Sequence, residues 1–190
     1  MTSWVIVFLV LAGGLFAFKI VYVLATAGAL PVTRGALYVS TSRIRIRAFL
    51  EAVPMSSDQV LYDLGCGDGR VLRAAGRRYG VKAEGWDVNV LAYLNARLRC
   101  FFRPGLRVRF GDFRAVDLGG ADVVFCYLFP DVMKDLAAKL ERELTPGARV
   151  ISANFPLPGW SPDRVIRPEP ARHADPIFIY RAPEAAADRS

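Results

Sequence analysis

The chain has 190 residues, of which 53% are hydrophobic, so it is long enough for one domain with a full core and an additional segment. Three cysteines without C-x-x-C spacing and a single histidine, His173, exclude a disulfide framework and a zinc site, and we expect no metal. The net charge is +7, but the arginines are spread along the chain without a lysine-rich tail or a nucleic-acid-binding motif, so we expect no nucleic acid partner.

The first segment is strongly apolar. Between residues 4 and 32 the only charged residue is Lys19. A bilayer core of about 30 Å requires about 20 apolar residues, and the long stem of Lys19 can carry its ammonium group to an interface. Trp4 and Tyr22 suit the two interfacial belts. We predict a transmembrane anchor over residues 1–30.

Three alternatives to an anchor are weaker. A buried core helix is rarely apolar for this length. A cleavable secretory signal is suggested by Ala25-Thr26-Ala27, but the segment lacks a positively charged start, and a mitochondrial transit peptide requires several Arg and Ser residues. No Lys or Arg precedes the span, whereas several arginines follow it, so the positive-inside rule predicts a single-pass protein of the cytoplasmic membrane whose domain faces the cytoplasm.

Basic clusters recur beyond the span. We interpret them as facing an anionic lipid surface, where each basic residue contributes about 1 kcal/mol. A solvated basic face without a partner is the alternative. The clusters are Arg43-Arg45-Arg47, Arg73-Arg77-Arg78 and Arg97-Arg99-Arg103.

Residues 31–57 are expected to form a juxtamembrane linker and a leading helix. Pro31 and Gly35 mark the linker. Ile44, Ala48 and Phe49 recur at helical spacing, which predicts a helix over 43–52.

Strand-like and helix-like runs alternate over residues 58–182, which predicts a mostly parallel sheet with helices on both faces and a ligand at the carboxyl ends of its strands. A closing antiparallel pair follows, and the tail 183–190 is expected to be disordered. The expected strands are 60–64, 81–86, 106–110, 121–128, 148–155, 164–167 and 177–181, and the expected helices are 70–79, 89–101 and 131–144.

A glycine-rich turn at 65–69 joins the first of these strands to a helix. Glycine lets the backbone pass close under a small molecule, although a strand-turn-helix corner can need glycine for steric reasons alone. The spacing is G-x-G-x-G, and the flanking carboxylates of Asp63 and Asp68 suit a ligand with positive charge rather than a pyrophosphate.

Acidic residues also follow the next two strands. Asp87 comes 24 residues after Asp63, roughly where a carboxylate holds ribose hydroxyls. Asp112 follows the third strand, where it can accept a hydrogen bond from an adenine amine. Helix capping and turn formation are the alternatives for both residues.

This set of motifs resembles the class I S-adenosylmethionine-dependent methyltransferases, whose first motif appears here as Asp63-Leu64-Gly65-Cys66-Gly67-Asp68-Gly69. The resemblance implies that the glycine turn lies beneath the methionine part and that the leading helix folds over the cofactor. Cys66 lies in this turn, where we expect a spacer rather than a nucleophile. The cofactor-binding residues that it implies are Tyr38, Thr41, Asp63, Gly65, Cys66, Gly67, Gly69, Asp87, Asn89, Asp112 and Phe113.

The fourth strand lacks the Asn-Pro-Pro-Tyr pattern of enzymes that methylate amide or adenine nitrogens. It offers aromatic rings instead, whose faces attract cations by roughly 0.5 to 2 kcal/mol. Tyr127 is our candidate for orienting an amine, and Asp122 is a weaker catalytic candidate because it can simply start the strand. The candidate substrate-binding residues are Phe129, Phe155 and Trp160, with core packing as the alternative for Phe129.

Residues 133–165 are similar to the membrane-anchored protein-lysine methyltransferases that modify the ATP synthase c-subunit and the adenine nucleotide translocase. The similarity includes Leu140-Glu141-Arg142-Glu143-Leu144 and Phe155-Pro156-Leu157-Pro158-Gly159-Trp160. It implies a Rossmann-like α/β enzyme behind one transmembrane helix, which methylates a lysine of a membrane-associated protein. A lipid or quinone methyltransferase and a non-catalytic membrane adaptor are the alternatives.

Overall fold

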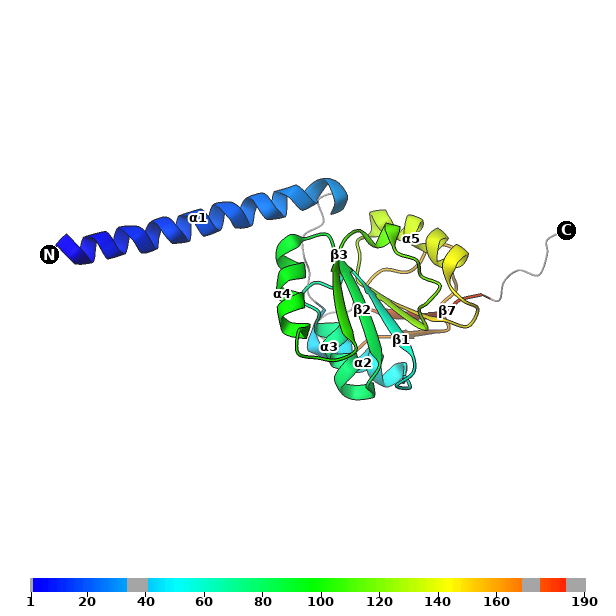
Figure 1. The fold of residues 1–190 in the computed structure, drawn as a ribbon. Helices are drawn as coiled ribbons and strands as arrows, with labels where there is room; N and C mark the ends of the chain where they lie inside the picture. Colours follow the sequence, from blue (N-terminus) through cyan, green and yellow to red (C-terminus); the bar gives the residue numbers. More distant parts are fainter. Residues whose placement is uncertain (1, 34–40, 169–174, 184–190) are drawn as a thin grey trace.

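A computed structural model describes residues 2–33, 41–168 and 175–183. Figure 1 shows one α/β body from which a long helix, α1, projects. The helices are α1 (Thr2–Thr33), α2 (Arg43–Ala52), α3 (Arg70–Tyr79), α4 (Val90–Cys100) and α5 (Pro130–Glu143), with a short 3₁₀ helix η1 (Phe113–Ala115). The strands are β1 (Val60–Leu64), β2 (Lys82–Asp87), β3 (Leu106–Phe110), β4 (Val123–Cys126), β5 (Arg149–Ala153), β6 (Arg164–Ile166) and β7 (Ile177–Arg181).

The seven strands form one sheet in the order β3-β2-β1-β4-β5-β7-β6. Strands β1 to β5 are parallel, and β7 runs antiparallel to both β5 and β6. The order reverses direction between β1 and β4, which is where open sheets of this kind bind ligands. The predicted fold class is confirmed, including the closing antiparallel pair.

Helices cover both faces of this sheet. Phe49 of α2, Leu72 of α3 and Ala96 of α4 are fully buried in one apolar cluster. Leu136 and Leu140 of α5 are fully buried in a second cluster on the other face. The strands between them are therefore covered on both sides, which is why β4 is apolar throughout.

The helix ends follow from local capping chemistry. The Ser42 side chain accepts a hydrogen bond from the Arg45 backbone N–H and starts α2. Pro130 occupies the first turn of α5, where a missing N–H costs nothing. The predicted strand over 121–128 is shorter, Val123–Cys126, because the residues on either side leave the β ladder.

None of the α1 side chains that the structure describes, at residues 4–24, belongs to either apolar cluster. Its segment Trp4–Leu24 is 21 residues long, is exposed throughout, and has the length and composition of a membrane span. The helix contacts α4. The expected linker over 31–57 lies partly outside the described residues, as does nearly all of the expected disordered tail.

Candidate functional site

The glycine turn leaves β1 at the point where the strand order reverses. The backbone N–H groups of Gly65 and Cys66 both donate to the carbonyl oxygen of Trp86 at 2.9 Å, which folds the turn back over β2. Gly65, Gly67 and Gly69 have φ values of 81°, 57° and 70°, which side-chain-bearing residues rarely adopt. The three glycines are therefore needed for the shape of the turn itself.

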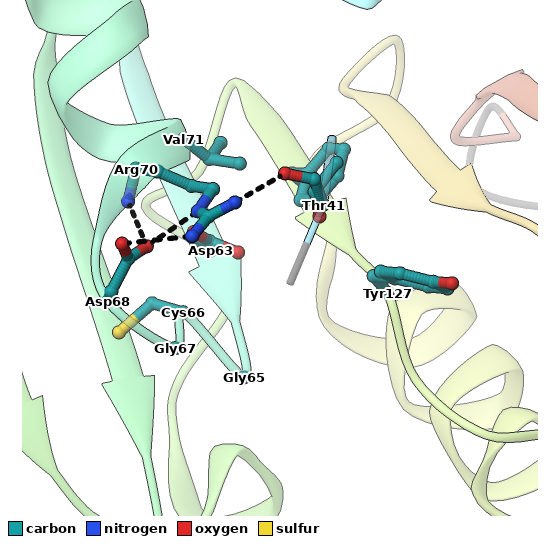
Figure 2. A pocket seen from close by; sticks show the side chains of 10 residues that line it. Thr41, Asp63, Gly65, Cys66, Gly67, Asp68, Arg70, Val71 and Tyr127 are labelled. Carbon is teal, nitrogen blue, oxygen red and sulfur yellow. Dashed lines mark hydrogen bonds and ion pairs between the residues drawn. The ribbon is translucent and has the colours of Figure 1, made fainter. Parts of the chain in front are cut away.

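A pocket opens above this turn (Figure 2). Asp63 of β1 lines it and is only 2% exposed, and its Oδ2 is the one buried side-chain oxygen or nitrogen in the described part of the chain that lacks a hydrogen-bond partner. Burial raises the pKa of Asp63 well above its usual value, and the nearby carboxylates of Asp87 and Asp68 raise it further. An unpaired buried carboxylate is costly, so this oxygen is suited to a cationic ligand group.

Asp68, the second carboxylate of the turn, is already paired. Arg70 donates from Nε to its Oδ1 at 2.8 Å, and Arg73 and Arg99 lie within 4 Å of its Oδ2. Burial by itself would raise the pKa of Asp68, but the hydrogen bond and charge of Arg70 and the charge of Arg73 hold it below its usual value. Asp63 rather than Asp68 is therefore the carboxylate of this turn that can pair with a positively charged ligand group.

Arg70 also connects the leading segment to the turn. Its Nη1 donates to the backbone carbonyl oxygen of Thr41 at 3.0 Å (Figure 2). Thr41, a candidate cofactor contact, is buried and lines the pocket, whereas Tyr38 lies outside the described residues. The segment that precedes α2 is thus attached to the pocket wall.

Asp87 lies at the end of β2, beside the turn. Its Oδ2 accepts from the Gly67 backbone N–H and its Oδ1 from the Asn89 N–H, both at 2.8 Å. Each carboxylate oxygen has a second lone pair, so these bonds leave room for ligand hydroxyls. The Asn89 side chain caps α4 through the N–H groups of Leu91 and Ala92, which accounts for its position without a ligand.

Asp112 and Phe113 follow β3. Asp112 caps η1 through the Arg114 backbone N–H and forms an ion pair with the Arg114 side chain at 2.9 Å. Phe113 is buried, with the Arg114 guanidinium 5.2 Å from its ring centre. The turn chemistry expected as the alternative is thus present at Asp112.

Tyr127 follows β4 and lines the pocket opposite the Asp68–Arg70 pair (Figure 2). Arg45 of α2 donates from Nη1 to the Tyr127 hydroxyl oxygen at 3.3 Å and lies over the ring, with 5.5 Å between the guanidinium carbon and the ring centre. The same guanidinium forms an ion pair with Asp175. A cation therefore already contacts the aromatic ring at the pocket.

The structure corrects the prediction for Asp122. This residue precedes β4, and its Oδ2 accepts from the Val60 backbone N–H at 2.7 Å. Tyr127 lies at the other end of the same strand, about 16 Å away for five extended residues. Asp122 therefore starts a strand and does not reach the pocket.

The three other aromatic candidates are also absent from the pocket lining that the described residues form. Phe155 and Trp160 pack on the cluster beneath α5, and Trp160 meets Tyr180 edge to face at 6.0 Å between ring centres. Phe129 is 36% exposed at the start of α5. Phe125 lines the pocket instead and packs on Phe49.

Two further residues were not found from the sequence. Arg45 looked like one member of a basic cluster, and nothing local shows that it meets Tyr127. Gly85 lies opposite Asp63 in the β1–β2 pair, and a Cβ added there would lie 2.6 Å from the Cys66 Cβ. A glycine within a strand is the signal that would have found it, because it marks a close approach of other atoms.

Comparison with known proteins identifies the family. The family model of the ANTKMT methyltransferase domain matches residues 63–164, which include the glycine turn, Asp87 and Tyr127. The chain belongs to this methyltransferase family. A protein-lysine N-methyltransferase of Saccharolobus islandicus (strain REY15A) is 37% identical over 148 residues, covering 75% of this chain and 91% of that protein.

Other relatives extend the comparison. The lysine N-methyltransferase of the ATP synthase c-subunit from Homo sapiens is 34% identical, and the match covers 64% of this chain but only 52% of that protein. A solved structure of an RNA methyltransferase from Salinibacter ruber in complex with S-adenosyl-L-homocysteine has a TM-score of 0.71 and 30% identity, covering 80% of this chain and 99% of that one.

This methyltransferase uses S-adenosylmethionine. The residues present fit that cofactor, since its methionine end carries an ammonium group and the unpaired Oδ2 of Asp63 is a buried acceptor beside the glycine turn. Its ribose hydroxyls match the remaining lone pairs of Asp87.

Proposed function

We propose that this methyltransferase modifies the side-chain nitrogen of a lysine in a membrane-associated protein, and that α1 anchors it in the membrane. The single observation that carries the assignment of the site is Asp63, whose buried, unpaired oxygen faces a pocket that also contains the Tyr127 ring. The lysine substrate is supported by the names of the relatives from Saccharolobus islandicus and Homo sapiens.

The proposed roles follow the positions of the side chains. Asp63 would accept a hydrogen bond from the ammonium group of the cofactor, Asp87 would hold its ribose hydroxyls, and the turn over Gly65 and Gly67 would support it from below. Thr41 closes the pocket from the leading segment, where Arg70 holds its backbone. S-adenosylmethionine supplies a methyl group that its positively charged sulfur readily releases.

The nitrogen that receives the methyl group must be neutral. A lysine with a pKa of about 10.4 is neutral in only about one molecule in a thousand near pH 7.4, a deficit of about 4 kcal/mol. Loss of water in the pocket and proximity to the Arg45 guanidinium, which lies over the Tyr127 ring, both disfavour an ammonium group, so they lower the pKa of an incoming lysine. Tyr127 then orients the amine, and the proton leaves to solvent.

The anchor is supported by α1. Its segment Trp4–Leu24 is exposed and apolar over 21 residues, and no described part of the domain covers it. The relatives that act on the ATP synthase c-subunit and the adenine nucleotide translocase have membrane proteins as substrates. An enzyme held at the bilayer surface meets such substrates directly.

Transfer of labelled methyl groups tests this function. The purified full chain in lipid nanodiscs is incubated with membrane vesicles and S-adenosylmethionine carrying a labelled methyl group, with the Asp63→Asn variant as control. We expect label in protein, recovered as methyl-lysine after hydrolysis, and none with the variant. Label in the organic phase would support a lipid substrate, and label in added RNA would support a nucleic acid substrate.

A non-catalytic adaptor predicts a different result. In that case the chain binds S-adenosylmethionine with the Asp63-dependent affinity but transfers no label to protein, lipid or RNA. Binding measured by calorimetry on the same samples separates this outcome from a misfolded preparation.

A further inference from the structure

The outward face of α4 carries an exposed apolar stripe. Five large side chains of α4 and the turn that follows it are between 42% and 88% exposed, and Phe102 is the most exposed of them. At 3.6 residues per turn they fall within about 120° of the helix circumference. They are Val90, Leu94, Leu98, Phe101 and Phe102, which we call the α4 stripe.

The stripe is distinct from the face that packs on the sheet. Ala96 and Cys100, which point to the opposite side of the helix, are the buried residues of α4. Phe101 and Phe102 contact each other edge to face, with 4.9 Å between ring centres, yet both remain exposed. Single exposed apolar residues are common, but a contiguous stripe marks a surface that another body covers.

Arginines border the stripe. Arg97, Arg99 and Arg103 are all exposed, and Arg97 and Arg99 lie on opposite sides of it. Apolar residues between basic ones are typical of helices that lie in the plane of a membrane interface, where arginines contact anionic headgroups and apolar side chains enter the acyl region. The charge and the apolarity of this surface thus match one partner, an anionic bilayer.

The position of α1 supports the same partner. Helix α1 contacts α4, and Figure 1 shows that α1 projects away from the domain on the side where α4 lies, crosswise to it. When α1 spans a bilayer, α4 therefore lies on the side of the domain that is nearest to that bilayer. A soluble protein partner would have to enter the space between the domain and the bilayer to reach the stripe.

We infer that the α4 stripe is a second membrane contact, which lies in the interface of an anionic bilayer and fixes the orientation of the domain. The inference rests on the proposed anchoring by α1. Helix α4 begins directly after Asp87 and its cap Asn89, so docking of α4 also sets the direction in which the cofactor pocket faces. A single anchor would allow the domain to rotate about it, whereas two contacts fix its orientation.

Site-directed labelling tests the docking. The full chain, carrying an environment-sensitive fluorophore at Leu98→Cys, is reconstituted into vesicles of phosphatidylcholine and phosphatidylglycerol. The native cysteines are at most 5% exposed, so labelling of the folded protein is selective. Val165→Cys is the matched control, because Val165 is an exposed apolar residue on β6, at the sheet edge opposite β3.

We expect the label at 98 to shift to shorter emission wavelengths on reconstitution, to be quenched by spin-labelled lipid, and to be quenched by aqueous iodide several-fold less than the label at 165. Adding Leu94→Glu and Phe102→Glu should make the label at 98 as accessible to iodide as the label at 165. This result would show that the α4 stripe, and not the fluorophore alone, causes the insertion.

Flotation of the vesicles separates the two proposals. If the chain floats but both labels are equally accessible to iodide, the docking is wrong while the anchor stands. If the chain does not float, the anchor and the docking both fail. Shielding at 98 that appears in lipid-free detergent and grows with protein concentration would assign the stripe to a second copy of the chain instead.

Discussion

Arg45 and Tyr127, 82 residues apart in the sequence, meet at the pocket through a 3.3 Å hydrogen bond and a stacked cation. One face of the Tyr127 ring is therefore already in contact with the cation of α2, so this face is not the one that receives a substrate amine. The ion pair between Arg45 and Asp175 holds that guanidinium in place. Tyr127 is thus connected to α2 and, through Arg45, to Asp175.

Tyr127→Phe should reduce turnover more than cofactor binding. The substitution removes the acceptor of a hydrogen bond from a charged donor, worth about 1.5–3 kcal/mol, so we expect kcat to fall about tenfold or more while the Kd for S-adenosylmethionine changes less than about twofold. Tyr93→Phe is the control, because Tyr93 forms a similar pair with Arg97 outside the pocket lining. Equal loss of binding and turnover would refute the orienting role.

Asp63→Asn should abolish cofactor binding yet stabilise the free chain. The folded-state pKa of Asp63 lies well above its ordinary value of 3.8. The folded chain therefore loses stability as the pH rises from 3.8 to this raised pKa, and the loss persists at higher pH. The Asn variant carries no charge at this position and therefore avoids this loss at neutral pH. Each kcal/mol gained in the free energy of unfolding raises Tm by about 2–4 °C. Thermal unfolding and calorimetry measure the two effects, and Asp122→Asn should leave cofactor binding intact.

The affinity for S-adenosylmethionine should fall as pH falls. The bound ammonium group requires the ionised form of Asp63, whose pKa is raised in the free site by burial and by Asp87 and Asp68. Below that raised pKa, each pH unit costs about tenfold in affinity, and binding releases a proton. Calorimetry in two buffers with different ionisation enthalpies measures the proton release. An affinity that stays constant over the acidic range would contradict the assignment of Asp63.

Gly85→Ala should destabilise the strand β2 where it packs against the glycine turn. The new methyl group would lie 2.6 Å from the Cys66 Cβ and 2.8 Å from a Leu72 methyl carbon, and overpacking of this kind costs about 1–3 kcal/mol. Gly76→Ala is the matched control, since its near neighbours are side-chain atoms of Leu106, which can move, and alanine favours the helix. Denaturant unfolding compares the two, and equal stability would show that the turn tolerates the methyl group.

The sequence was informative wherever one local rule decides the structure. Apolar runs and capping residues predicted the bounds of α2, β1, α3, β3 and β7 as they occur, and the acidic glycine turn predicted the pocket. Residue type alone was insufficient to predict which residues lie on the substrate side of the pocket. Asp122 has the chemistry of a catalytic group but lies at the wrong end of its strand, and Trp160 has the chemistry of a cation-binding ring but packs on Tyr180.

Contacts between distant segments could not be predicted. The pairing of Arg45 with Tyr127 depends on how α2 packs across the sheet, which no spacing within 43–52 encodes. The same is true of Asn154 after β5, the one described residue other than glycine with a positive φ, 74°. Asparagine tolerates that conformation, but the sequence does not show that the chain requires it there.

The hydrogen bond from Arg70 to the Thr41 carbonyl oxygen connects the pocket to the segment that follows α1, and so limits how far the pocket can lie from the apolar span. Between the apolar span that ends at Leu24 and the pocket wall at Thr41 lie nine further helical residues, about 14 Å, and eight more peptide steps, at most about 28 Å. With α1 in the bilayer, as we propose, every methyl transfer would occur within about 40 Å of the membrane surface. The search for a substrate becomes two-dimensional, and the effective concentration of membrane proteins at the pocket rises accordingly, while soluble proteins gain nothing.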